Sequence, residues 1–108
     1  MASQTYIPIV PLADVPDNGS TAVSAFGRSI LICKSHGNVY AVANECSHQQ
    51  QPLAGGRVRG TFLFCPVHGA RYDLRTGMPS GTLTQQAIRT YAARVHGDWI
   101  EISESASG

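Results

Sequence analysis

Two short stretches decide how this chain folds: Cys46-Ser47-His48 and, after sixteen intervening residues, Cys65-Pro66-Val67-His68-Gly69. Each stretch brings one cysteine and one histidine to the base of a glycine-rich loop. The short spacing within a pair lets one loop present both side chains to a single centre. The longer gap lets two loops close on that centre from opposite sides. Because thiolate and imidazole are both metal ligands, the four side chains predict a metal site.

The region around these pairs differs from the rest of the chain. Over residues 44–80, glycine and proline recur every few positions, and only Thr61–Phe64 is typical of a strand. Ordering each residue costs about 1–2 kcal/mol of conformational entropy, and few apolar side chains are present here to offset that cost. We therefore expect residues 44–80 to form a loop-rich insertion that a bound metal holds in place.

The segments that flank the insertion predict β-strands. Tyr6–Val10 is a β-rich run, and its Pro8 indicates a strand at the edge of a sheet. Two hairpins are predicted, in which Ser29–Lys34 precedes Asn38–Ala43 and Arg89–Val95 precedes Trp99–Ser103. Helical periodicity is limited to a turn or two near residues 14–20 and 84–88. The sequence therefore predicts an all-β fold.

Several other side chains have simple structural interpretations. His36 and His96 each precede a glycine at the tip of a predicted hairpin, so they are expected to be turn residues. Cys33 lies within a predicted strand and is expected to be a small buried side chain rather than a metal ligand. Trp99 and Phe26 are expected in the core.

The size and composition are those of one small globular domain. The chain has 108 residues, 43% of them hydrophobic and 14% charged, with a formal net charge of +1. There is no basic excess for nucleic acid, and no apolar run approaches the roughly 18 residues of a membrane span. An odd number of cysteines, three, rules out a full disulfide framework. The N-terminus lacks the features of a secretory signal, so we expect a cytoplasmic protein with neither nucleic acid nor membrane as a partner.

Zinc and iron are the two metals that this donor set suits. Structural zinc sites can use two cysteines and two histidines, but zinc fingers place both cysteines in one knuckle and both histidines on a helix. Here each loop mixes one cysteine with one histidine, which suits a 2Fe-2S cluster whose thiolates hold one iron and whose imidazoles hold the other. The iron cluster is the favoured interpretation, and a non-redox zinc-binding module is an alternative.

The segments Cys46–His48 and Cys65–Asp73 strongly resemble the cluster-binding loops of Rieske proteins. Pro66 after the second cysteine and Gly69 after the second histidine are specific features of that pattern. The resemblance covers nearly the whole chain, and its size is similar to that of the Rieske-type ferredoxins of bacterial aromatic-ring dioxygenase systems. It implies one Rieske domain over residues 1–108: an antiparallel β-sandwich base (1–43 and 81–108) and a cluster-binding subdomain (44–80).

The resemblance also implies the ligands and the role. Cys46 and Cys65 would hold the buried iron of the cluster, and His48 and His68 would hold the outer iron near the surface. The chain would be a monomer that carries one electron at a time from a flavin-dependent NAD(P)H reductase to a terminal non-haem iron oxygenase. It would not be an enzyme, because it has no nucleotide-binding glycine motif and no second set of iron ligands. A Rieske-like small subunit of a nitrite reductase is the second alternative.

Departures from the pattern of respiratory Rieske proteins affect the expected reduction potential. Gln51 and Val67 stand where those proteins have two cysteines that form a disulfide between the loops. Ala70 replaces a serine whose hydroxyl donates a hydrogen bond to sulfur, whereas Tyr72 keeps the second hydroxyl donor. With fewer donors, we expect a potential in the lower part of the Rieske range of about −150 to +300 mV, raised slightly by Tyr72. Simple packing is the alternative role for Tyr72. Pro79 falls where the family has a proline loop that covers the cluster.

Charge is unevenly distributed along the chain. Residues 46–94 hold six arginines against one aspartate, whereas the remainder holds two basic and six acidic residues. A basic half that contains the cluster would steer docking onto an acidic partner. The alternative is that these arginines are scattered, solvated surface charges.

Overall fold

The computed structural model describes residues 5–45, 52–66, 70–80 and 86–104. Strands account for most of these residues, and their one helical element is the 3₁₀ turn η1 (Leu12–Asp14). The predicted all-β class is therefore confirmed. No helix among the described residues is long and apolar enough to cross a membrane.

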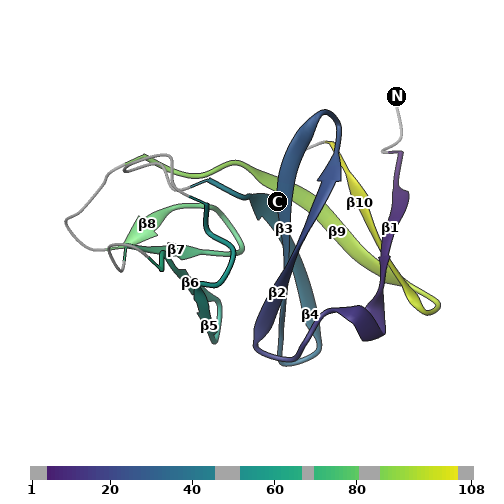
Figure 1. Ribbon diagram of the computed structural model, residues 1–108, viewed down its shortest axis with the longest axis horizontal. Helices are drawn as coiled ribbons and strands as arrows, with labels where there is room; N and C mark the ends of the chain where they lie inside the picture. Colours follow the sequence, from purple (N-terminus) through teal and green to yellow (C-terminus); the bar gives the residue numbers. More distant parts are fainter. Residues whose placement is uncertain (1–4, 46–51, 67–69, 81–85, 105–108) are drawn as a thin grey trace.

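The base of the molecule is a six-stranded antiparallel sheet with the order β1-β10-β9-β4-β3-β2. Its strands are β1 (Ile7–Pro11), β2 (Gly19–Ala25), β3 (Arg28–Ser35), β4 (Asn38–Ala43), β9 (Thr90–His96) and β10 (Trp99–Ser103). Both predicted hairpins are present, as β3–β4 and β9–β10 (Figure 1). His36 and Gly37, with φ of 51° and 79°, form the left-handed turn that such a hairpin favours.

The sheet folds over into two layers because β9 is shared between them. Thr90 and Tyr91 pair with β4, whereas Ala92–His96 pair with β10, and the edge strands β1 and β2 contact each other. Apolar side chains fill the space between the layers, as expected for a β-sandwich. This base core comprises Val10, Val15, Ile30, Ile32, Ala41, Tyr91, Ile100 and Ile102.

Strand β1 lies at an edge, as Pro8 indicates, and its register with β10 shifts between Pro8 and Val10. Strand β2 was not predicted, and residues 14–20 were instead expected to have a helical turn. The short turn η1 already ends at Asp14, and seven strand residues begin at Gly19, so the expectation of a helical turn over residues 14–20 was wrong. None of these seven side chains is fully buried, which explains why the apolar alternation was too weak to identify.

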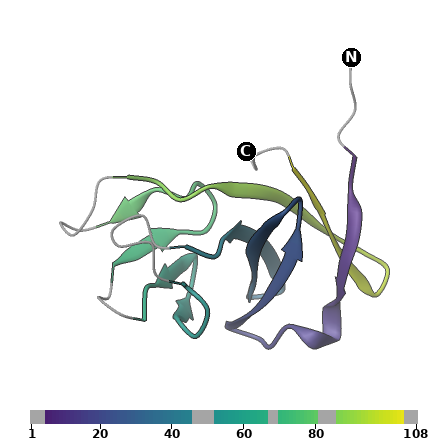
Figure 2. The same ribbon diagram turned by 45° about the horizontal axis from the view of Figure 1, so that its top comes forward.

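A second, four-stranded sheet with the order β5-β6-β7-β8 lies beside the base (Figure 2). Its strands are β5 (Arg57–Arg59), β6 (Phe62–Phe64), β7 (Arg71–Asp73) and β8 (Pro79–Ser80). The expectation that only residues 61–64 form a strand in this region was therefore wrong. The other strands are two or three residues long, which is too short for sequence periodicity to reveal.

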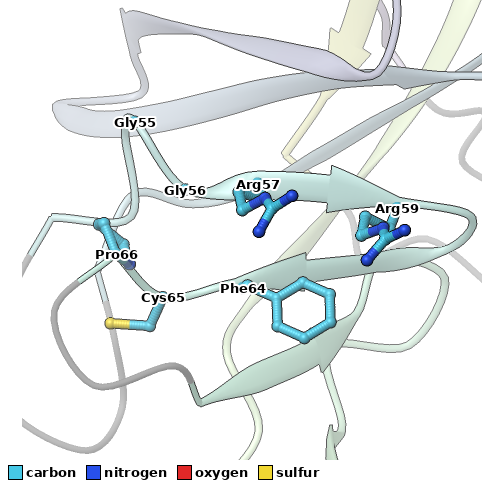
Figure 3. A pocket seen from close by; sticks show the side chains of 7 residues that line it. All are labelled: Gly55, Gly56, Arg57, Arg59, Phe64, Cys65 and Pro66. Atoms are coloured by element: carbon cyan, nitrogen blue, oxygen red, sulfur yellow. The ribbon is translucent and has the colours of Figure 1, made fainter.

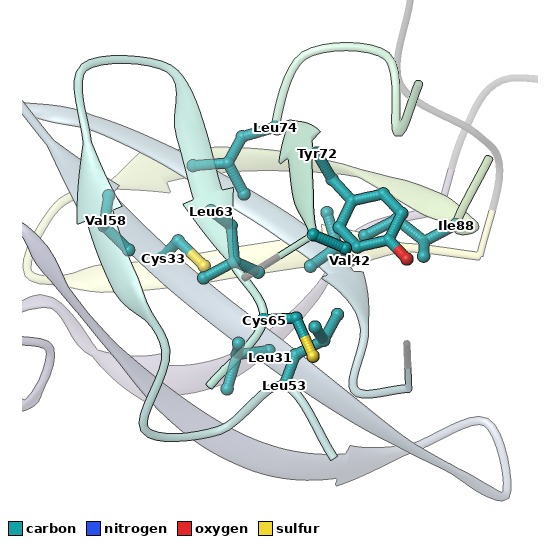
Figure 4. Close-up of a cluster of buried hydrophobic side chains, with 11 residues drawn as sticks. Leu31, Cys33, Val42, Leu53, Val58, Leu63, Cys65, Tyr72, Leu74 and Ile88 are labelled. Atoms are coloured by element: carbon teal, nitrogen blue, oxygen red, sulfur yellow. The ribbon is translucent and has the colours of Figure 1, made fainter. Parts of the chain in front are cut away.

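The second sheet packs on the base through a second apolar cluster, in which β3 takes part with its other face. Alternate side chains of a strand point to opposite faces. Ile30 and Ile32 lie in the base core, whereas Leu31 and Cys33 lie in the second cluster, and all four are fully buried. The remaining buried members of this cluster are Val42, Leu53, Val58, Leu63, Cys65, Ala70, Tyr72, Leu74 and Ile88 (Figure 4).

Seven of those side chains come from residues 44–80, so the expectation that this region is too poor in apolar side chains to contribute to a core was wrong. Cys33 is buried as predicted, and burial raises the pKa of its thiol to about 12, so it is neutral at physiological pH. Phe26 packs against the base core and stacks on Tyr91 with ring centroids 6.1 Å apart. Trp99 was expected in the core but is 46% exposed, because it lies at the start of β10 beside the hairpin turn.

Candidate metal centre

Cys65 directly follows strand β6, and its side chain faces the base. Leu63 of β6 pairs with Tyr72 of β7, and the Cys65 N–H donates a hydrogen bond of 2.6 Å to the carbonyl of Ala70. Because side chains two residues apart share a face, Leu63, Cys65, Ala70 and Tyr72 all point the same way. This hydrogen bond therefore holds the two ends of the segment between β6 and β7 together, with the Cys65 thiol directed inward.

The Cys65 side chain lies in a dry environment next to a tyrosine. Cys65 is 3% exposed and Tyr72 is fully buried, and both belong to the second apolar cluster (Figure 4). Their positions are diagonal across the two strands, a separation of about 7–8 Å that a long aromatic side chain can span. The fold thus brings the Tyr72 side chain into the neighbourhood of the Cys65 thiol.

Asn44 fixes the two ends of the segment between β4 and Leu53. Its side-chain oxygen accepts hydrogen bonds from the N–H groups of Leu53 and Ala54, at 2.8 and 2.9 Å. Its side-chain nitrogen donates to the Ser29 hydroxyl at 3.1 Å, and its backbone N–H donates to the Ser29 carbonyl at 3.1 Å. One side chain therefore joins the residues just before and just after the predicted Cys46–His48 loop to strand β3.

Glycines bring these segments close to their neighbours. A Cβ atom at Gly56 would overlap the carbonyl oxygen of Phe64, so only glycine lets the chain after Leu53 approach the end of β6. At Gly77, which has a φ of 77°, a Cβ atom would overlap the carbonyl oxygen of Ile88. The Gly77 carbonyl accepts a hydrogen bond from the Ile88 N–H at 2.9 Å, which joins the chain just before β8 to the chain just before β9.

The structure describes four of the eight predicted site residues. Cys46, His48, His68 and Gly69 lie outside the described residues. Among the described residues, no three His, Cys, Asp or Glu side chains come together. Pro66 is exposed directly after Cys65. Pro79, for which the resemblance implies a place in a loop that covers the cluster, is the first residue of β8 and pairs with Tyr72.

The described part of the site suits a metal centre. Cys65 is a free thiol on the rigid end of a strand, held by a backbone hydrogen bond and shielded from water. Cys33 does not suit this role, because it lies within strand β3 and is fully buried among apolar side chains. The sequence analysis missed Asn44, although an asparagine at a strand end before a loop is a known pattern for side-chain to backbone hydrogen bonds.

Comparisons with known proteins agree with this geometry. The chain is 27% identical over 103 residues to the ferredoxin component of a naphthalene 1,2-dioxygenase system of Pseudomonas aeruginosa, covering 95% of this chain and 99% of that protein. It is 29% identical over 93 residues to the ferredoxin component of naphthalene 1,2-dioxygenase/salicylate 5-hydroxylase systems of a Ralstonia species, covering 86% and 89% of the two chains.

A solved structure has the same fold. The ferredoxin of carbazole 1,9a-dioxygenase from Nocardioides aromaticivorans IC177 superposes with a TM-score of 0.86 at 27% identity, covering 94% of this chain and 99% of that one. The family described as Rieske [2Fe-2S] domain matches residues 5–92. This match spans most of the 108 residues of the chain. The chain therefore belongs to the Rieske family, and a Rieske 2Fe-2S cluster is its cofactor.

Proposed function

We propose that this protein is a one-electron carrier that serves a multicomponent aromatic-ring dioxygenase. The observation that carries the proposal is the buried Cys65 at the end of β6, whose backbone N–H donates a hydrogen bond to the Ala70 carbonyl and which shares its apolar cluster with Tyr72. A protein that binds a redox centre on a small, otherwise inert β-scaffold has the parts of a carrier. Its named relatives are ferredoxin components of naphthalene dioxygenase systems, which supports the same role.

We assign the ligands as the sequence predicts them. Cys46 and Cys65 would hold the buried iron, and His48 and His68 would hold the outer iron. Bound in this way, a 2Fe-2S cluster supplies one-electron redox chemistry at a higher potential than a four-thiolate cluster. The residues of the chain set its surroundings: Asn44, Ala70 and Gly77 hold the flanking segments, Tyr72 would offer the cluster a hydroxyl donor, and Ala70 would offer none.

The partners follow from the role. The chain would accept electrons from a flavin-dependent NAD(P)H reductase, deliver them to a terminal oxygenase, and have no catalytic site of its own. We expect it to act as a monomer, with residues 44–80 as the cluster-binding subdomain. All four strands of the second sheet fall within that range.

A matched pair of cysteine variants tests the ligand assignment. Cys65→Ala should abolish the visible absorbance of the cluster, because one thiolate ligand is lost. Cys33→Ala should retain it, because Cys33 only fills space in the apolar cluster. Loss of the cluster in both variants, or in neither, would contradict the assignment.

A reconstituted electron-transfer assay tests the role. The purified protein is combined with flavin reductases and terminal oxygenases of aromatic-ring dioxygenase systems, and NAD(P)H-dependent product formation is measured. The proposal predicts that product forms only when this protein is present. An iron-loaded protein that supports no oxygenase but passes electrons to a nitrite reductase would instead support the nitrite reductase alternative, and a colourless zinc-loaded protein would support the zinc module.

A further inference from the structure

The outer face of the second sheet carries cationic and aromatic side chains. Because side chains alternate along each strand, Val58, Leu63 and Tyr72 point to the base, and their neighbours point to solvent. The register places Arg57 beside Phe64 and Arg59 beside Phe62, while Arg71 of β7 lies on the other side of Phe64. The side chains that share this outer face are Arg57, Arg59, Phe62, Phe64, Arg71 and Asp73.

Most arginines of the basic region are engaged in contacts within the protein. Arg75 pairs with Asp73, Arg94 pairs with Glu101, and both ion pairs measure 2.8 Å. Arg89 lies 4.8 Å from the ring centroid of Tyr91, and Arg71 lies 5.7 Å from that of Phe62.

Arg57 and Arg59 differ from those four. Both are exposed, and neither forms a hydrogen bond or an ion pair within the part of the chain that the structure describes. They are two residues apart on one strand, so their guanidinium groups point to the same side. Two neighbouring cations that have no counter-ion among the described residues are suited to bind carboxylates.

These two arginines border a hollow that reaches the metal centre. The hollow has a volume of about 460 Å³, and its lining includes Arg57, Arg59, Phe64, Cys65 and Pro66. Figure 3 shows the guanidinium groups of Arg57 and Arg59 and the ring of Phe64 on the same side of strands β5 and β6. The cationic surface is thus continuous with the residue that we assign as a ligand of the buried iron.

We propose that this surface, formed by Arg57, Arg59 and Phe64, docks the electron-transfer partner through Asp or Glu carboxylates on the partner protein. The inference rests on the proposed function as an electron carrier. A half-buried aromatic ring flanked by arginines has the composition of residues that dominate binding energy in protein interfaces. Charge complementarity makes an acidic partner surface the matching occupant, and docking here would bring it next to Cys65 and Pro66.

The test compares the effects of arginine variants on the rate of electron transfer. Stopped-flow kinetics would give the second-order rate constants with the reductase and with the terminal oxygenase that are active in the reconstituted assay. The variants are Arg57→Gln, Arg59→Gln and the double variant. Arg94→Gln is the matched control, because it removes the same charge on β9 in the base. The double variant Arg57→Lys/Arg59→Lys keeps the charge, and cluster absorbance and reduction potential are recorded for every protein.

At low ionic strength, the double glutamine variant should react about tenfold more slowly with at least one partner, whereas Arg94→Gln should stay within about twofold of wild type. The difference should vanish towards an ionic strength of about 1 M, where the Debye length falls to about 3 Å. The lysine variant should recover most of the rate.

Two results would overturn the docking proposal. In the first, the double glutamine variant has the same rate constants as wild type with both partners. In the second, Arg94→Gln lowers the rate constants as much as Arg57→Gln or Arg59→Gln does. Either result would leave the carrier role intact, because wild type would still transfer electrons. Failure of wild type to react with any reductase or oxygenase would instead overturn the proposed function.

Discussion

The side-chain oxygen of Asn44 accepts a hydrogen bond of 2.8 Å from the backbone N–H of Leu53, across the ends of the predicted Cys46–His48 loop. A second bond from the Ala54 N–H and a bond to Ser29 complete the connection. The loop therefore starts and returns at one fixed point on strand β3. This arrangement makes Asn44 a positioning residue for the first pair of ligands.

Replacing Asn44 should loosen the cluster-binding loop. Asn44→Ala leaves the Leu53 and Ala54 N–H groups without their acceptor and should lower the free energy of unfolding by about 1–2 kcal/mol. It should also speed the loss of cluster absorbance on dilution into chelator. Asn44→Asp keeps an acceptor oxygen, so its free energy of unfolding and its rate of cluster loss should stay much closer to those of wild type. Equal rates of cluster loss in wild type and Asn44→Ala would contradict this role.

Gly77→Ala should be strongly destabilising, because the new Cβ atom would overlap the Ile88 carbonyl oxygen and the residue has a positive φ of 77°. We expect chemical denaturation to show that the free energy of unfolding falls by more than about 2 kcal/mol. Gly97→Ala is the control: Gly97 also has a positive φ, of 61°, but no atom lies within 4 Å of its Cβ position. Gly97→Ala should lower the free energy of unfolding by only about 1 kcal/mol. Similar losses in the two variants would show that crowding at Ile88 is unimportant.

Tyr72→Phe should lower the reduction potential, because it removes a hydroxyl donor that favours the reduced cluster. A hydrogen bond about 1 kcal/mol stronger in the reduced state corresponds to roughly 40 mV for a one-electron couple. Tyr91→Phe is the control, because Tyr91 is buried in the base core, and its hydroxyl has no hydrogen-bond partner among the described residues. A redox titration in which Tyr72→Phe matches wild type would assign Tyr72 to packing alone.

Asp73 should make stability depend on pH in the acid range. Hydrogen bonds from the Arg75 guanidinium hold the pKa of Asp73 below its usual value and outweigh the opposite effect of partial burial. A depressed pKa means that the ionised form stabilises the fold above the unfolded pKa of about 4, and that this contribution is lost as the pH falls through the folded pKa.

The difference in unfolding free energy between wild type and Asp73→Asn should therefore be constant at neutral pH and shrink in acid. It should be no more than about 1 kcal/mol, because Arg75 is exposed on the surface. Unfolding curves of the two proteins across this range measure it. A difference that grows as the pH falls would contradict the assignment.

The sequence predicts those parts of the fold that have strong local patterns. The hairpins at β3–β4 and β9–β10 combine apolar runs with a glycine turn, and Pro8 correctly indicates an edge strand. Strands β5, β7 and β8 escape prediction, because they are too short to show periodicity. Trp99 is exposed although it is large and aromatic, since its place beside a turn depends on the register of β10.

The candidate site, too, is only partly predictable from the sequence. The cysteine and histidine spacing identifies the family, which the comparisons confirm. Burial of Cys65 beside Tyr72 depends on the antiparallel register of β6 and β7, and the anchoring by Asn44 depends on contacts between segments nine and fifteen residues apart. Such long-range relationships are absent from local sequence patterns, so only the folded chain reveals them.

The central claim is that this chain carries a Rieske 2Fe-2S cluster and exchanges one electron. Its most direct test is a chemical analysis of iron and acid-labile sulfide in anaerobically purified protein, followed by a dithionite titration of the same sample. The account predicts two irons and two sulfides per chain and uptake of one electron with bleaching of the visible spectrum. A folded protein that contains neither iron nor labile sulfide, or that binds zinc and is unaffected by dithionite, would contradict it.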